Sequence, residues 1–202
     1  MSPEIEKLKE IIHKLIEKHD GDKIKLREKD KNATLTDVSL SDISGHSLLL
    51  KADKAKIQTF AKGYANKQCD YIIMSEYNKQ KYAVFIELKS SVKDKSARQG
   101  APAKIEDENE DYVTQLLSSS CLFDFFHSVL KNFCDIPALV DEYQRRYVVL
   151  HNKEIPEIAK SVPPTRPFLS DSPKRAYVKK IVNGQTISFQ SLIRETCPCS
   201  TH

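Results

Sequence analysis

The sequence predicts an α/β fold in which a helix, three strands, a second helix and a fourth strand follow one another. Three observations lead to this order. Two apolar runs flank a polar turn between residues 71 and 88, an apolar stripe at helical spacing covers residues 112 to 133, and the strand-like segment YQRRYVVL follows at 143 to 150. The chain has 202 residues, of which 40% are hydrophobic and 30% charged, so one sizeable core is expected.

The first 63 residues predict a helix followed by a loop, a strand and a second helical segment. Ser2 and Pro3 can begin the first helix, apolar residues recur at helical spacing from 5 to 16, and Gly21 supplies a stop. Residues 22 to 45 are mainly polar and predict a loop with a short strand near Val38 and Leu40. Residues 46 to 51 predict a strand and residues 53 to 63 a helical segment.

The segment CDYIIMSEYNKQKYAVFIELK, residues 69 to 89, has the pattern of a β-hairpin. If the turn is centred on Asn78 and Lys79, residues whose numbers sum to 157 face each other across the two strands. Asp70 is then opposite Glu87, and Lys89 lies on the same face as Glu87. Two carboxylates and an ammonium group therefore meet at one end of an apolar hairpin.

This charge cluster has two explanations. Two carboxylates across a strand pair repel each other, and burial makes that arrangement unfavourable unless a cation joins them. Oxygen ligands of this kind suit Mg²⁺ or Mn²⁺, and an adjacent lysine can orient water and stabilise charge on a phosphate. The plainer alternative is a strand end near solvent, at which Lys89 pairs with Glu87 or Asp70.

Asp70, Glu87 and Lys89, with their flanking strands, resemble the core of the PD-(D/E)XK nuclease superfamily, with Cys69 in place of the proline. The resemblance implies the restriction-endonuclease-like fold, with an αβββαβ core and a mixed sheet flanked by helices. It also implies that Asp70 and Glu87 bind the metal ion. The Leu88 carbonyl is a candidate further ligand, and Lys89 corresponds to the catalytic lysine.

The stripe at residues 112 to 133 predicts the longest helix of the chain. The acidic run from Glu106 to Asp111 precedes it and is favourable at a helix N-terminus without any functional role. Gln115 lies at the edge of the stripe, where a buried amide needs a hydrogen-bond partner. It is either a core glutamine bonded to the backbone or, as in several branches of the resembled superfamily, a catalytic-site glutamine that reaches toward the metal.

Two basic regions are candidate phosphate-binding surfaces. The segment after the hairpin predicts either a solvated linker or a loop that holds a polyanion over the site. Residues 137 to 202 contain ten Lys or Arg and six Asp or Glu, a surplus of four that equals the net charge of +4 of the whole chain. A nucleic-acid contact and a solvated surface explain this region equally well. The candidate nucleic-acid-binding residues of the two regions are Lys93, Lys95, Arg98, Arg145, Arg146, Lys174 and Arg175.

The chain is expected to form one domain, with a core at about residues 1–151, an extension at about 152–195 and a loose tail at 196–202. Asn183 and Gly184, between two alternating runs, predict a C-terminal β-hairpin in the extension.

The five cysteines lack a paired C-x-x-C motif and indicate reduced thiols. No membrane-spanning run or signal peptide is recognisable, which predicts a cytoplasmic protein with no membrane partner.

These features predict a metal-dependent nuclease that hydrolyses phosphodiester bonds of DNA, with RNA as the second choice. Such an endonuclease would suit antiviral defence or DNA repair, and it is compatible with a homodimer or with control by a partner protein. The alternative is a catalytically inert nuclease-fold subunit that binds nucleic acid or assembles with other proteins. Retention of both carboxylates and of the lysine favours the enzyme.

Overall fold

The computed structural model describes residues 3–19, 21–28, 33, 35–55, 68–89, 106–136, 142–152, 171–173 and 176–193. The helices are α1 (Pro3–Ile11), α2 (Glu106–Phe133) and α4 (Gln190–Ile193), with short 3₁₀ helices η1 (His13–Leu15) and η2 (Ala52–Lys54). The strands are β1 (Ile16–Glu17), β2 (Ile24–Arg27), β3 (Asp37–Ser41), β4 (Leu48–Lys51), β5 (Tyr71–Tyr77), β6 (Gln80–Lys89), β7 (Tyr143–His151), β8 (Tyr177–Lys180) and β9 (Thr186–Ser188).

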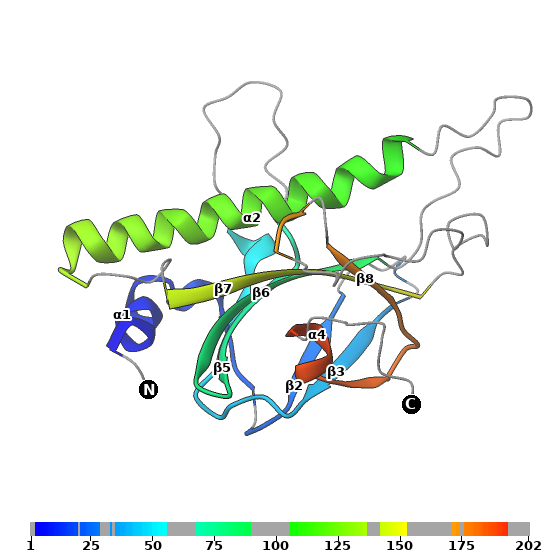
Figure 1. Cartoon of the computed structure of the whole chain (residues 1–202), viewed down its shortest axis with the longest axis horizontal. Coiled ribbons are helices and arrows are strands. Elements are labelled where there is room, and N and C mark those ends of the chain that lie inside the picture. The colour runs from blue at the N-terminus through cyan, green and yellow to red at the C-terminus, as the bar shows by residue number, and fades with distance from the viewer. Residues whose placement is uncertain are drawn as a thin grey trace, which may run out of the picture.

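These elements form three layers around a six-stranded mixed sheet with the order β1-β4-β5-β6-β7-β8. Helices α1 and α2 contribute to the core on one face of this sheet. The second sheet, β2-β3-β9, and helix α4 contribute to the core on the other face. Figure 1 shows α2 running along the first face, with β2, β3 and α4 below the second.

The large sheet confirms a mixed α/β fold; the predicted succession of three strands, a helix and a strand corresponds to β4, β5, β6, α2 and β7, but β1, β2 and β3 lie between α1 and β4. Strands β4, β5 and β6 are antiparallel neighbours, whereas β7 pairs with β6 in parallel. A parallel neighbour requires a crossover from one end of the sheet to the other, and α2 lies within that crossover. The order α1, β4, β5, β6, α2, β7 thus places the β5–β6 hairpin beside α2.

The hairpin has the register that its turn residues predicted. Tyr71 faces Ile86 and Tyr77 faces Gln80, so paired residue numbers sum to 157. The two turn residues between the strands have φ values of 50° and 64°, the left-handed pair expected of a type I′ turn. Because the twist of this turn matches that of the strands, it fixes the register up to the far end of the hairpin.

Both faces of β6 are buried, which explains its nearly continuous apolar sequence. Ala83 and Phe85 belong to the core under α2, while Val84 and Ile86 belong to the core under the second sheet. Phe85 stacks on Tyr147 with 4.9 Å between ring centroids and meets Phe123 of α2 edge to face at 5.8 Å. These aromatic contacts attach α2 to the middle of the sheet.

The predicted first helix is shorter than its apolar pattern suggested. Helix α1 ends at Ile11, well before the expected stop at Gly21, and η1 follows. Ile16 then faces Leu50 of β4, so the apolar pattern continues in a strand at the sheet edge. As a strand, this segment can hydrogen-bond to the backbone N–H and C=O groups along the edge of β4, which a longer helix would leave unpaired.

The prediction for residues 22 to 45 was correct for β3 and wrong for β2. Strand β3 confirms the expected strand near Val38 and Leu40, both fully buried. Strand β2 was predicted as loop, although its four residues alternate between buried and exposed positions. Pairing with β3 stabilises so short a strand.

The predicted C-terminal hairpin is wrong. Strand β8 extends the large sheet in parallel to β7, whereas β9 joins the second sheet in parallel to β3. Asn183 and Gly184 do form a turn, in which Gly184 has φ 74°. The side-chain oxygen of Asn183 accepts the backbone N–H of Thr36 at 2.6 Å, which attaches this turn to the second sheet. The two strands therefore diverge after a turn that normally joins antiparallel neighbours.

The long helix is confirmed, and α2 begins at Glu106, before the predicted stripe. Leu116, Phe123 and Leu130 of the stripe are fully buried, but Phe133 at its end is 83% exposed.

Residues 56–67, which include most of the second predicted helical segment, lie outside the described residues. In the part of the chain that the structure describes, no helix combines the length and apolar character that a membrane crossing requires.

Candidate functional site

The end of the β5–β6 hairpin brings the four candidate catalytic residues together on the face of the sheet that α2 covers. Alternate residues of β6 share a face, so Glu87 and Lys89 follow Phe85 toward α2. Asp70 precedes β5, and the register of the hairpin places it across from Glu87. Gln115 approaches from α2, and its Oε1 accepts a hydrogen bond from Lys89 Nζ at 2.8 Å. Gln115 thus contacts Lys89 through its side chain, and a catalytic role for it stays a prediction.

Asp70 is a buried carboxylate, with only 8% of its surface exposed. Its Oδ2 accepts the backbone N–H of Leu88 at 2.7 Å, and its Oδ1 lies 3.8 Å from Lys51 Nζ. Burial raises the pKa of Asp70 to about 6, although the Leu88 amide and the Lys51 ammonium oppose that shift. The ionised form that a metal ion requires is therefore costly in the metal-free protein and would be favoured by a bound cation.

The resemblance implied that Leu88 acts through its carbonyl, whereas the structure shows a contact of its backbone N–H. Its backbone N–H orients the Asp70 carboxylate, while its side chain is buried in the core under the second sheet. Leu88 thus orients Asp70, a candidate metal ligand, through its backbone amide. Metal binding by the Leu88 carbonyl remains a proposal.

Glu87 and Lys89 form an ion pair at the boundary between core and solvent. Glu87 is 3% exposed, and its Oε1 lies 2.8 Å from Lys89 Nζ. The Lys89 side chain is 31% exposed, so its ammonium group is accessible while it contacts Glu87 and Gln115. A plain charge cluster would contain the same ion pair, so this contact alone does not distinguish catalysis from structure.

Lys51 is a site residue that the sequence reasoning missed. It is 1% exposed, and its Nζ lies 3.3 Å from an Asp53 oxygen and 4.2 Å from the centre of the Tyr71 ring. Burial acts to lower the pKa of Lys51, but Asp70, Tyr71 and Asp53 outweigh it and raise that pKa. The signal was available: a lysine that ends the otherwise apolar strand LLLK is not an ordinary surface residue.

Ser119 connects α2 to the chain that enters β5, and it was also missed as a site residue. Its Oγ accepts the backbone N–H of Cys69 at 2.7 Å. Its hydroxyl can donate to the Gln115 carbonyl oxygen at 2.9 Å or to Gln68 Oε1 at 3.2 Å. Burial raises the pKa of the Cys69 thiol far above its ordinary value, so this cysteine stays neutral beside the carboxylates. Ser119 therefore connects the turn of α2 that carries Gln115 to Cys69, the residue before Asp70.

His151 is a further titratable residue at this end of the sheet that the sequence reasoning missed. It pairs with Lys89 across β6 and β7, and it is 8% exposed. Because residues paired in a parallel ladder share a face, the imidazole belongs to the same side of the sheet as the Lys89 ammonium group. Its position as the last residue of an apolar strand was the available signal.

The two described arginines of the candidate nucleic-acid surface lie away from this site. Arg145 and Arg146 pair with Ala83 and Val84, so they precede the level of Glu87 by three to four residues, roughly 10–13 Å along the strand. Arg145 pairs with Asp124 of α2, and Arg146 is buried on the other face of the sheet. The other candidates, namely Lys93, Lys95, Arg98, Lys174 and Arg175, lie outside the described residues.

The raised pKa of Asp70 gives the metal-free protein a specific pH dependence. The folded state holds the Asp70 proton more tightly than the unfolded chain does, so this group lowers stability as pH rises from about 4 through 6. The shift from 3.8 to about 6 corresponds to roughly 2–3 kcal/mol. Asp70→Asn is expected to become more stable relative to the parent over that interval, measured by urea unfolding in EDTA. Parallel stability curves for the two proteins would contradict this assignment.

The donor set suits a small, oxygen-preferring cation. No group of three or more His, Cys, Asp or Glu side chains is placed to hold a metal within the described ranges. Magnesium, however, commonly uses one or two carboxylates and completes its coordination with water and substrate phosphate. The buried, oppositely placed carboxylates of Asp70 and Glu87 fit that requirement.

Comparison of the chain with protein-family models, with curated proteins and with solved structures finds no match.

Proposed function

We propose that the chain is a metal-dependent nuclease that hydrolyses phosphodiester bonds of DNA, with Mg²⁺ or Mn²⁺ as its cofactor. The observation that carries the proposal is the convergence of Asp70, Glu87, Lys89 and Gln115 at one hairpin end. The order α1, β4, β5, β6, α2, β7, with β7 parallel to β6, agrees with the restriction-endonuclease-like core and supports the same proposal.

In this proposal Asp70 and Glu87 hold the ion. A bound divalent cation lowers the pKa of a coordinated water and neutralises charge on the scissile phosphate. The Leu88 amide orients one Asp70 oxygen, and Lys51 lies beside the other. These contacts fix the carboxylate before substrate arrives, so less ordering is required when the ion binds.

Lys89 acts on the water and the phosphate rather than as a ligand. Its ammonium group is partly exposed, and contacts to Glu87 and Gln115 limit where it can point. From this position it orients the attacking water and stabilises the negative charge that develops on the phosphate oxygens. Gln115 positions the lysine, and Ser119 positions the turn of α2 that carries Gln115.

A second function is favoured by one specific observation. Each carboxylate already lies near an ammonium group, Asp70 near Lys51 and Glu87 near Lys89. Two such pairs are electrically balanced without any metal ion. The competing proposal is therefore a nuclease-fold subunit with an inert site, which binds nucleic acid or assembles with other proteins.

Incubation with nucleic acids separates these two functions. The purified chain is expected to cleave supercoiled, linear or single-stranded DNA in Mg²⁺ or Mn²⁺ and to lose all cleavage in EDTA, because both proposed ligands act through the ion. RNA serves as the second substrate class, and nicking of the supercoiled form identifies endonuclease action. Asp70→Asn, purified in parallel, controls for a contaminating nuclease. Cleavage that survives EDTA or the substitution would refute the metal mechanism, and binding without cleavage in every metal would favour the inert subunit.

A further inference from the structure

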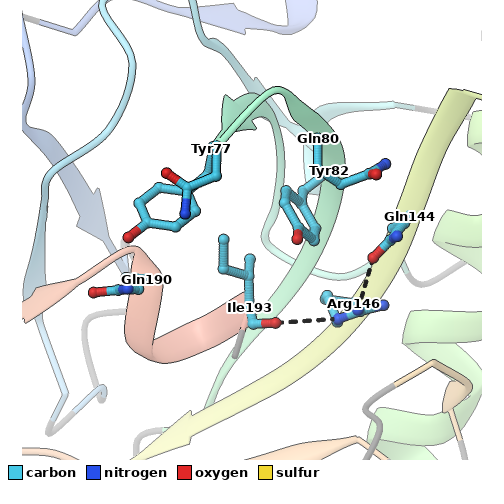
Figure 2. Close-up of a pocket in the computed structure, with 8 residues that line it drawn as sticks. Tyr77, Gln80, Tyr82, Gln144, Arg146, Gln190 and Ile193 are labelled. Atoms are coloured by element: carbon cyan, nitrogen blue, oxygen red, sulfur yellow. Dashed lines mark hydrogen bonds between the residues drawn. The ribbon is translucent and has the colours of Figure 1, made fainter. Parts of the chain in front are cut away.

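A polar pocket of about 490 Å³ lies near the turn of the β5–β6 hairpin, on the face of the sheet opposite α2. Figure 2 shows that its lining comes from the hairpin, from β7 and from α4. The volume is within the range of roughly 300–1,000 Å³ that is typical of small-molecule sites. Tyrosine, glutamine and arginine side chains dominate the lining: Tyr77, Tyr82, Gln80, Gln144, Gln190 and Arg146.

Arg146 brings a buried positive charge to this pocket. Only 7% of the residue is exposed, yet within the described residues its guanidinium forms no ion pair with a carboxylate. It donates to three neutral acceptors, the carbonyl oxygens of Ile193 and Arg145 and the side-chain oxygen of Gln144. A guanidinium carries five N–H groups, so its donor capacity exceeds these three bonds. Buried charges are normally paired, and an anion in the pocket would complete this one.

The remaining lining groups suit a planar, hydrogen-bonding ligand. Tyr77 and Tyr82 offer ring faces, and the Arg146 guanidinium lies 5.6 Å from the centre of the Tyr82 ring. Aromatic rings bind nucleobases by stacking without strong preference for sequence. The side-chain amides of Gln80 and Gln190 can each donate and accept, as the edges of nucleobases require.

We propose that this pocket binds a nucleoside phosphate, with its phosphate on Arg146 and its base against the tyrosines. Arginine is well suited to this role because its planar fork matches phosphate oxygens in a two-bond geometry. The ligand can be a free mononucleotide or the phosphorylated end of a nucleic-acid strand, since both present the same chemistry. The neighbouring amides then read the edge of the base.

The pocket is separate from the proposed metal site. Arg146 pairs with Val84, whereas His151 pairs with Lys89, so the two levels differ by five residues, roughly 16 Å along the strand. Arg146 also lies on the face of the second sheet, and the Lys89–Gln115 pair lies on the face of α2. Binding in the pocket can therefore be measured without metal and without cleavage.

The test is calorimetric titration of the full chain in EDTA with nucleoside 5′-monophosphates, the matching uncharged nucleosides and inorganic phosphate. A parallel series uses short single strands with and without a 5′-phosphate. Mononucleotides are expected to bind at least about 10-fold more tightly than the uncharged nucleosides, because a nucleoside lacks the phosphate and cannot form the charge-assisted contact with Arg146. Asp70→Asn is expected to leave the affinity unchanged, which separates this site from the metal site.

Arg146→Gln is expected to weaken mononucleotide binding by about 10-fold or more. The matched control is Arg145→Gln, because that neighbouring arginine pairs with Asp124 on the opposite face and should leave affinity unchanged. Tyr77→Ala removes a ring at a partly buried position and provides a second test if Arg146→Gln does not fold. Tighter binding of the 5′-phosphorylated strand than of the free mononucleotide would indicate that the ligand is the end of a nucleic-acid strand.

Three results would overturn the proposal. They are no mononucleotide binding at millimolar concentration, equal affinity for nucleoside and nucleotide, and inorganic phosphate binding as tight as the nucleotide. An affinity that Arg146→Gln and Tyr77→Ala leave unchanged would overturn it as well, because binding would then occur elsewhere.

Discussion

Lys89→Ala is expected to slow single-turnover DNA cleavage by about 10²-fold or more, roughly 2.7 kcal/mol of transition-state stabilisation. The same variant is expected to bind Mn²⁺ at least as tightly as the parent. The reason is the ion pair of 2.8 Å between Lys89 Nζ and Glu87 Oε1, in which the ammonium group competes with a metal ion for the carboxylate. Removing the lysine frees the Glu87 carboxylate, the proposed ligand, but also removes the group proposed to orient the water.

Lys81→Ala is the matched control for this experiment. Lys81 lies at the other end of β6 and pairs with Glu142, away from the site. It should therefore leave both cleavage and Mn²⁺ affinity unchanged. Parental cleavage by Lys89→Ala, or a loss of Mn²⁺ binding that parallels the loss of cleavage, would remove the lysine from its proposed role.

Phe85→Ala is expected to lower the free energy of unfolding by about 3–5 kcal/mol, the range for a buried aromatic side chain. Phe85 is fully buried and contacts both Tyr147 and Phe123 through its ring. Its removal leaves a cavity where β6, β7 and α2 meet, so the neighbouring rings lose their contacts as well. Urea unfolding measures the change.

Phe125→Ala on the same helix is the control, because Phe125 is 60% exposed and its substitution should change stability by less than about 0.5 kcal/mol. A cost below about 1 kcal/mol for Phe85→Ala would contradict the packing of α2 on the centre of the sheet. A large cost for Phe125→Ala would instead indicate that the outer face of α2 is covered.

The hairpin and its charge cluster could be predicted because their causes are local. Asn78 and Lys79 accept the left-handed conformation of a tight turn, and the register follows from the turn. The two-residue period of a strand then places Glu87 and Lys89 on one face, across from Asp70. The sequence alone therefore suffices to assemble the two carboxylates and the lysine.

The missed features depend on partners that lie far away in the sequence. Lys51 becomes part of the site only because β4 pairs with β5, and Ser119 only because α2 crosses the start of that strand. The diverging strands β8 and β9 each find a parallel partner more than 25 residues away. No local pattern at Asn183 and Gly184 distinguishes that outcome from a hairpin.

The central claim is that Asp70 and Glu87 together bind a divalent metal ion, and calorimetric titration of Mn²⁺ into metal-free protein tests it most directly. The parent should bind Mn²⁺, while Asp70→Asn and Glu87→Gln should each lose that binding, since each replaces a negatively charged ligand by a neutral amide. Glu76→Gln, an exposed carboxylate near the turn of the same hairpin, should bind as the parent does. Normal Mn²⁺ binding by both site variants, or no binding by the folded parent, would show that these residues form a charge cluster without a metal.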